Sequence, residues 1–225
     1  MHFRLKEFCE IAEKLYPPFE EKDGISLSEI ETAEENYGFR LPEVLRDYYR
    51  IAGNHENINY SFNQLISVDC LEIEDRKLIF FQENQGISEW AIDSSDLSGD
   101  DPPVWQGVYV EGQESKDWYL ETKRLSTFFI SMLCWQSVMG GLPFGALMEK
   151  VGKEVVKKLA DNYEVIDFYG DYSEMKAFIG KEKVFCVFEK DDRFSLYVGA
   201  ANEADLIEIN DLLQIKWDYN SLTDE

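Results

Sequence analysis

The first part of the chain alternates apolar stripes of helical spacing with residues that end helices. One stripe covers residues 3–15 and stops before Pro17-Pro18, which cannot continue a helix. A second stripe has two serines placed to cap its start, and Gly38 supplies the left-handed residue at its end. A third begins after Pro42, which the first turn of a helix tolerates, and closes at Gly53. Three helices are therefore predicted here.

The periodicity changes after residue 65 to that of strands. Residues 78–81 and 87–92 are predicted to pair around a turn in which Gly86 takes a positive φ. Residues 104–110 and 118–120 are predicted to be further strands. Residues 125–139 then form a helix that is apolar on all sides, which favours burial in the core over docking to a partner.

The last third of the chain reads as a second block of helices and hairpins. Its predicted elements are a helix over 148–159, an extended segment over 163–169, a hairpin of 182–189 with 193–199 around Asp191-Asp192, and a helix over 203–213. The tail after Trp217 is expected to be frayed.

These elements predict an α+β fold with a mixed or antiparallel sheet flanked by helices. A single domain over residues 1–225 is the simpler organisation, since no low-complexity linker divides the chain. The alternative is a core of about residues 25–140 with an accessory lobe over about 141–225.

The net charge of the chain indicates which kinds of molecule it can bind. It has 45 acidic and 22 basic residues among 225, which gives a net charge of −23. Such a charge argues against nucleic acid and anionic membranes, because binding them requires lysine and arginine to neutralise phosphates. It attracts basic proteins and accelerates association with them, although simple solubility explains an acidic surface equally well.

The four cysteines, Cys9, Cys70, Cys134 and Cys186, are far apart and contain no CxxC pair. They are predicted to be free, buried thiols in a reducing cytoplasm, and no metal site is expected. The N-terminal segment lacks the apolar core of a signal peptide, and no apolar run approaches the roughly 20 residues of a membrane span. A cytoplasmic protein is therefore expected.

Acids and aromatic residues are interleaved between residues 84 and 121, with Lys116 as the only base in that segment. Aromatic anchors among carboxylates suit the binding of a basic protein, whereas the plainer interpretation is half-buried sheet aromatics beside solvated acids. The predicted partner-binding residues are Glu89, Trp90, Asp93, Asp96, Asp100, Asp101, Trp105, Tyr109, Glu111, Glu114, Asp117 and Trp118.

Signs of catalysis are weak. The chain contains no G-x-S-x-G, Walker loop, H-E-x-x-H or G-x-G-x-x-G motif. His55, in the turn after the third helix and near Asp47 and Glu56, is the one candidate for an acid–base pair, and a solvated surface role is the expected one. We therefore predict no catalytic residues, no cofactor and no metal.

An ordered set of motifs over about residues 25–140 carries a resemblance to a known superfamily. The matching residues are Glu31, Glu34, Glu35, Gly38, Leu41, Pro42, Tyr48, Tyr49, Gly53 and Asn54 in the helices, then Phe80, Glu83, Gly86, Trp90, Ile92 and Asp93, then Asp101, Pro102, Pro103, Val104 and Trp105, and finally Phe128 and Phe129. In this order and spacing the chain resembles the SUKH (SMI/KNR-like) superfamily. In the family the helix-exit glycine often follows Asn, whereas here Ala52 precedes Gly53, and the C-terminal third has no counterpart.

The resemblance implies a compact α+β fold and a role in protein binding. Bacterial members look like immunity proteins that neutralise toxins, many of them nucleases, and fungal relatives look like regulators of cell-wall assembly and signalling. The partner implied is a basic, nuclease-like toxin domain, whose active site is occluded. The alternatives are a regulatory scaffold that binds resident signalling or envelope proteins, and a hydrolase that uses His55. The sequence leaves the oligomeric state open.

Overall fold

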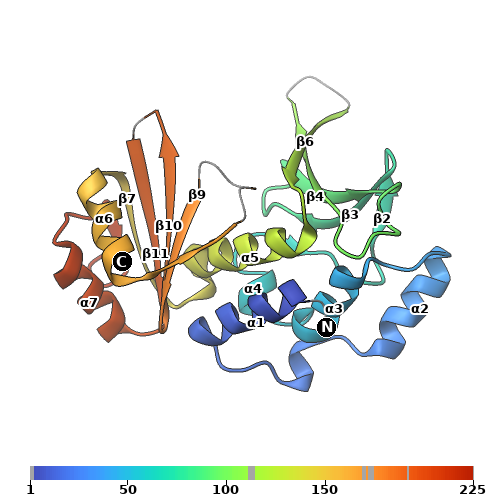
Figure 1. The fold of residues 1–225 in the computed structure, drawn as a ribbon, viewed down its shortest axis with the longest axis horizontal. Coiled ribbons are helices and arrows are strands. Elements are labelled where there is room, and N and C mark those ends of the chain that lie inside the picture. Colours follow the sequence, from blue (N-terminus) through green and yellow to red (C-terminus); the bar gives the residue numbers. More distant parts are fainter. Residues whose placement is uncertain (1–2, 111–114, 169–170, 172–174, 192, 225) are drawn as a thin grey trace.

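The computed structural model of the chain describes residues 3–110, 115–168, 171, 175–191 and 193–224. Within them the strands form two antiparallel sheets that stand beside each other above a layer of helices (Figure 1). This arrangement confirms the predicted α+β class, with the strands divided between two sheets rather than gathered in one. The order in the first sheet is β1-β3-β4-β5-β6, with β2 beside β3, and the order in the second is β12-β7-β11-β10-β9-β8.

The N-terminal helices follow the local capping signals. They are α1 (Phe3–Leu15), the 3-10 turn η1 (Glu21–Asp23), α2 (Leu27–Tyr37), α3 (Glu43–Ala52) and the short α4 (Glu56–Asn59). Ser26 caps α2 by accepting the Glu29 N–H, and Gly38 ends that helix with a φ of 75°. The three predicted helices are confirmed, whereas α4 has too few residues to show a periodic stripe.

The first sheet comes from the predicted hairpins. Its strands are β1 (Gln64–Leu65), β2 (Glu72–Glu74), β3 (Lys77–Gln82), β4 (Ser88–Asp93), β5 (Val104–Tyr109) and β6 (Lys116–Thr122). Gly86, at the turn between β3 and β4, has the expected positive φ of 71°. Residues 111–114, which connect the strands predicted over 104–110 and 118–120, lie outside the described residues.

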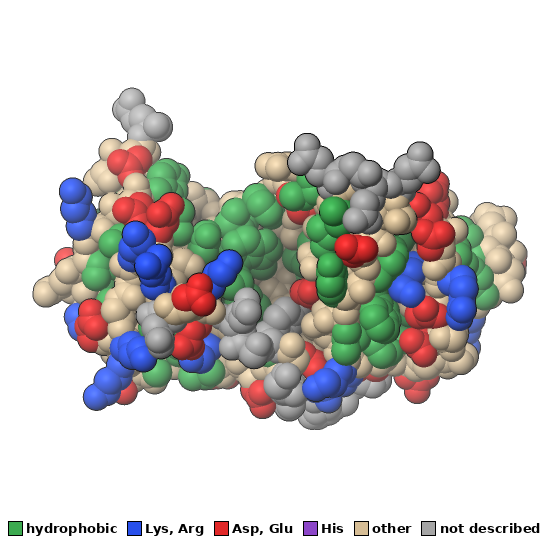
Figure 2. All heavy atoms as spheres, turned by 90° about the horizontal axis from the view of Figure 1, so that it is seen from above, with side chains coloured by type: hydrophobic (Ala, Val, Ile, Leu, Met, Phe, Trp, Pro, Cys, Tyr) green, Lys and Arg blue, Asp and Glu red, His purple; other side chains and the backbone are tan. Residues whose placement is uncertain are grey.

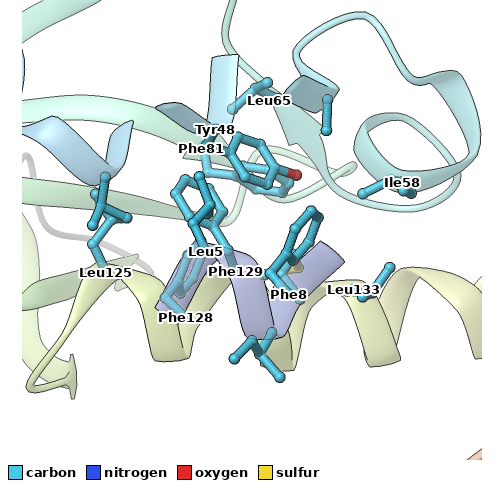
Figure 3. Packing of buried hydrophobic residues seen from close by; sticks show 14 of the residues in the cluster. Leu5, Phe8, Tyr48, Ile58, Leu65, Phe81, Leu125, Phe128, Phe129 and Leu133 are labelled. Atoms are coloured by element: carbon cyan, nitrogen blue, oxygen red, sulfur yellow. The ribbon is translucent and has the colours of Figure 1, made fainter. Parts of the chain in front are cut away.

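Helix α5 (Leu125–Gln136) runs beneath both sheets and ends in a π-type turn, η2 (Ser137–Gly141). It contacts α1, α3, β6 and β10, and every residue of the helix except Trp135 is buried. The predicted burial of this all-apolar helix is therefore confirmed. Figure 3 shows its Phe128 and Phe129 packed among residues of α1, α3 and the first sheet, where Phe129 stacks on Tyr48 with ring centroids 3.6 Å apart.

The second sheet has hydrophobic packing on both faces. Its strands are β7 (Phe144–Val151), β8 (Glu164–Ile166), β9 (Met175–Gly180), β10 (Lys183–Lys190), β11 (Arg193–Ala200) and β12 (Tyr219–Asn220). Ala177, Val184 and Cys186 join the core around α5, whereas Phe178 and Phe185 join a separate cluster under α6 (Lys153–Asn162) and α7 (Glu203–Leu213). The sheet thus shares one core with the N-terminal half and holds a second core of its own.

Two predictions for this region are wrong. The predicted helix over 148–159 is a strand in its first part, since Met148 pairs with Leu196 in β11, and the helix begins only after the extended Gly152. The tail after Trp217 is ordered rather than frayed, because Tyr219 and Asn220 pair with β7. Both errors arise from pairing with distant strands, which local sequence does not show. The division into domains stays a prediction.

The side chain of Gln136 ties the end of α5 to the loop before β1. Its Oε1 accepts the backbone N–H groups of Phe62 (3.1 Å) and Asn63 (2.9 Å), and its Nε2 donates to the Asn63 carbonyl (2.6 Å). All these contacts lie in or next to the buried interior, so their loss leaves polar backbone groups unpaired.

We predict that Gln136→Leu lowers the free energy of unfolding by about 3 kcal/mol, because it strands buried N–H and C=O groups. The matched control is Gln85→Leu at an exposed turn, which is expected to change stability by less than about 0.5 kcal/mol. Urea denaturation of both variants measures the difference, and equal midpoints would contradict the structural role of Gln136.

Candidate functional site

The predicted partner-binding residues of the first sheet divide between its two faces. Paired residues on neighbouring strands point to the same side of a sheet. The register pairs Glu89 with Gly107, Gly107 with Trp118 and Ala91 with Trp105, which places these side chains on one face, called here the outer face. Trp90 pairs with Gln106 and lies on the opposite face, towards α5.

The outer face carries a ladder of alternating rings and ammonium groups. Lys77 Nζ lies 5.2 Å from the Trp105 ring centroid and 5.6 Å from that of Trp118. Lys116 Nζ lies 5.9 Å from the Trp118 centroid and 4.9 Å from that of Tyr109. Each distance is within the range of a cation–π interaction. The two lysines therefore hold three aromatic rings in a fixed row.

The carboxylates of this face are paired with the same two lysines. Lys116 Nζ lies 2.5 Å from oxygens of both Glu74 and Glu89, and its side chain is only 2% exposed. Lys77 Nζ lies 2.7 Å from Asp93, which Arg76 also approaches. The outer face is thus less negative than its sequence alone indicates.

These ion pairs shift the pKa values of Asp93 and Lys116. A hydrogen bond from Lys77, aided by bonds from Ser95, holds the pKa of Asp93 well below its usual value of 3.8. Burial by itself lowers the pKa of Lys116, but hydrogen bonds to Glu74 and Glu89 outweigh it and raise that pKa above the usual 10.5. Asp93 and Lys116 are therefore both charged at neutral pH.

The remaining predicted residues are scattered around the first sheet. The Asp101 carboxylate accepts the Ser126 N–H at 2.8 Å and its hydroxyl at 2.6 Å, so it caps the start of α5. The Asp100 carbonyl accepts the Val44 N–H, and the side chain is exposed. Asp96 is half-buried in the turn after β4, and Asp117 is exposed on β6. Glu111 and Glu114 lie outside the described residues.

The structure also forms a cleft that the sequence analysis missed. It lies between the two sheets, above α5, and has a volume of about 360 Å³. Figure 2 shows the molecule hollowed between its two lobes, with hydrophobic side chains gathered along the hollow. Trp135, the half-exposed residue of α5, lies there with its ring centroid 5.3 Å from that of Phe188 and 5.2 Å from that of Tyr197. Phe62 packs edge-on against the same indole.

The polar lining of the cleft comes mainly from the first sheet. Glu83, Gln106 and Glu121 contribute side chains from strands or their ends, and Trp90 and Asn63 lie deeper in the wall. The cleft residues are spread from position 62 to position 197, and no local motif joins them. The one signal in the sequence was Trp135, a large aromatic residue near the C-terminal end of a uniformly apolar helix.

His55 does not form the predicted acid–base pair with Asp47, whose carboxylate instead approaches Arg50 at 3.5 Å. The imidazole packs edge-on against Tyr16 and Phe19, with ring centroids 5.4 and 5.7 Å away. Burial lowers the pKa of His55, and the negative charge that opposes this shift most comes from Asp23. These contacts favour a packing role for the imidazole.

The cysteines agree only in part with prediction. Cys134 and Cys186 are buried, and burial raises the pKa of Cys134 to about 12. Cys9 is half-buried and Cys70 is exposed, so the prediction of four buried thiols is wrong for these two. Cys70 lies in the loop between β1 and β2, where Asp69 is also exposed and Leu71 is buried.

Two properties of the described residues bear on other functions. They contain no group of three or more His, Cys, Asp or Glu side chains placed to hold a metal ion. None of their helices combines the length and the apolar content needed to cross a membrane.

Comparison with known proteins identifies one family. Residues 24–131 match the model of the SMI1 / KNR4 family (SUKH-1). The matched segment begins just before α2 and ends within α5, so it contains the whole first sheet but no strand of the second. No curated protein and no solved structure matches the chain.

We predict that Lys116→Met lowers the free energy of unfolding by about 1–3 kcal/mol at neutral pH, because it leaves Glu89 partly buried without its partner. The matched control is Lys216→Met at an exposed position. The pKa of Lys116 is raised in the folded state. Its ion pairs therefore contribute fully to the free energy of unfolding below pH 10.5, and this contribution is lost as the pH rises above that value through the folded-state pKa. Thermal unfolding at pH 7 compares the variants, and equal stabilities would contradict the role given to the pair.

Proposed function

Because the chain belongs to the SMI1 / KNR4 family (SUKH-1) through residues 24–131, we propose that it is an immunity protein that binds and neutralises a cognate toxin. The toxin domain is basic and nuclease-like, and the protein acts by occluding its active site or substrate groove. Family membership is the observation that carries this proposal, since an immunity role is consistent with it.

The electrostatics support a basic partner. With a net charge of −23, the chain attracts a domain whose own surface is positive because it holds nucleic-acid phosphates. Neutralisation requires no bond making or breaking. Rigid carboxylates and aromatic rings that replace the substrate in a basic groove are sufficient.

The outer face of the first sheet suits such a contact. Its ring ladder is held by two lysines, so little side-chain freedom remains to be lost on binding. On this face Tyr109 is 44% exposed, and Leu120 on β6, which pairs with Trp105, is 50% exposed. The twelve residues predicted from the sequence remain the proposed contact set, with Asp101 better explained by its cap on α5.

The direct test is co-expression with the toxin domain encoded beside this protein's gene. We expect the chain to restore growth to cells that make the toxin and, when purified, to inhibit the toxin's activity in proportion to binding. Binding without inhibition, or the capture of resident signalling or envelope proteins in place of a toxin, would favour a regulatory scaffold instead.

Charge reversal at acidic residues around the first sheet tests whether they accelerate association. The residues suited to it are Asp96 and Asp117, because Glu89 and Asp93 hold ion pairs and Asp101 caps a helix. We predict that Asp96→Lys with Asp117→Lys slows association with the toxin roughly tenfold at low salt. Stopped-flow kinetics measures the rate constants, and the difference should shrink at 1 M salt.

The matched control is Asp161→Lys with Asp211→Lys. Both residues are exposed near the C-terminal ends of α6 and α7, on the side of the second sheet away from the cleft, and lysine is tolerated at helix C-termini. This pair makes the same change in net charge. Equal slowing by both pairs would show that total charge, and not the acidic residues around the first sheet, steers the partner.

A further inference from the structure

The outer face of the first sheet shows how this chain holds a cation. There Lys116 lies between carboxylates of Glu74 and Glu89 and beside the rings of Tyr109 and Trp118. Rings provide the negative face of their π system and carboxylates provide the formal charge, so together they stabilise an ammonium group removed from water.

The cleft between the two sheets repeats these components without the cation. Its walls carry the rings of Trp135, Phe188 and Tyr197 and the carboxylate of Glu83. No lysine, arginine or histidine is among the described residues that line it. The cleft is therefore an acidic, aromatic cavity within a chain of charge −23.

Glu83 has an oxygen placed to accept a further hydrogen bond. The N–H groups of Gln85 and Ile87 both donate to Oε2 of Glu83, at 2.8 and 3.4 Å, and so fix the carboxylate at the turn before β4. Oε1 of the same carboxylate is not used by these bonds. The turn thus presents a positioned charge at the cleft.

Two buried polar atoms in the cleft wall point independently to a ligand. Trp90 is 6% exposed and Asn63 is 2% exposed, and both line the cleft. Trp90 Nε1 and Asn63 Oδ1 have no hydrogen-bond partner among the described residues. Buried polar groups are almost always paired, so one donor and one acceptor in the same wall indicate an occupant with both kinds of group.

We propose that the cleft receives an arginine side chain from a segment of the partner protein. The guanidinium lies against the rings of Trp135 and Tyr197 and donates to Glu83 and Asn63, and a carbonyl of the segment accepts from Trp90 Nε1. Arginine suits the cleft because its planar group stacks on aromatic rings while its N–H groups donate to carboxylates. This occupant rests on the proposed function, since the basic toxin domain supplies the arginine.

The size of the cleft agrees with such an occupant. Its 360 Å³ equals the volume of roughly a dozen water molecules. That space accommodates one long side chain with the adjoining backbone, and is at the small end of the range for small-molecule sites.

The five tryptophans of the chain allow a direct test. Trp90 and Trp135 line the cleft, Trp105 and Trp118 lie on the outer face, and Trp217 donates to Asn210 at the far side of the second sheet. Their indole N–H signals in a ¹⁵N spectrum, assigned by single Trp→Phe variants, therefore report each surface separately.

The protein is titrated with the peptide acetyl-Leu-Arg-Leu-amide and, separately, with the same peptide in which citrulline replaces arginine. Citrulline keeps the shape of arginine and loses its charge. We expect saturable shifts of the Trp90 and Trp135 signals with a dissociation constant on the order of 1 mM, and binding at least about tenfold weaker for citrulline. Equal binding of the two peptides, no shift at Trp90 and Trp135, or shifts confined to Trp105 and Trp118 would each overturn the proposal.

A matched pair of variants tests whether the arginine peptide binds in the cleft. Glu83→Gln removes the charge and keeps an oxygen that accepts the N–H groups of the turn. We expect it to weaken binding of the arginine peptide about fivefold or more. Glu72→Gln makes the same change on exposed β2 and should leave binding unaltered. Equal affinities in the two variants would remove Glu83 from the site.

Binding experiments with the toxin distinguish the cleft proposal from the immunity function on which it rests. If the wild-type chain neutralises the toxin and Glu83→Gln binds it as tightly, the cleft proposal is wrong and the immunity function stands. If the wild-type chain neutralises no toxin while the arginine peptide still shifts Trp90 and Trp135, the cleft chemistry stands and its partner is another basic protein.

Discussion

The structure depends on the burial of α5 on every side. A helix whose faces are all apolar must be covered all round, and here α1 and α3 lie against one part of it while β6 and β10 bring both sheets to another. Because one helix serves both sheets, the sheets stand apart above it. Trp135 is the residue of α5 that neither sheet fully covers, and the cleft forms over it.

The two surfaces of the first sheet differ in how they balance charge. On the outer face, Lys77 and Lys116 neutralise nearby carboxylates and order three aromatic rings, which gives a rigid surface of reduced charge. Towards α5, the same sheet contributes Glu83 to a cavity without a basic residue among its described lining. The outer face is thus complete in itself, whereas the cleft has the composition of a site that a cation from another molecule completes.

Local signals in the sequence were sufficient for the elements that local chemistry determines. Ser26 and Gly38 delimit α2, and Gly86 turns β3 into β4, because caps and positive φ depend on single residues. The segment around Met148 was misread, since its strand is imposed by pairing with Leu196, almost fifty positions away. Long-range pairing of this kind has no local signature.

The candidate site was predictable only in part for the same reason. The aromatic residues of the outer face were found because Trp105, Tyr109 and Trp118 are close in sequence. Lys77, which contacts the Trp105 ring and pairs with Asp93, was not found, because it comes from β3, before the acidic segment begins. The cleft joins residues from both sheets and α5, so it becomes visible only when the fold brings them together.

Hydrogen exchange of the chain, free and bound to the basic toxin domain proposed as its partner, tests the account most directly. A complex in which backbone amides slow their exchange on β4 and β5 and around Trp135 and Phe188 would show the partner seated on the first sheet and in the cleft. Slowing confined to α6 and α7, or no complex at all, would contradict the claim that this chain neutralises a basic partner through these surfaces.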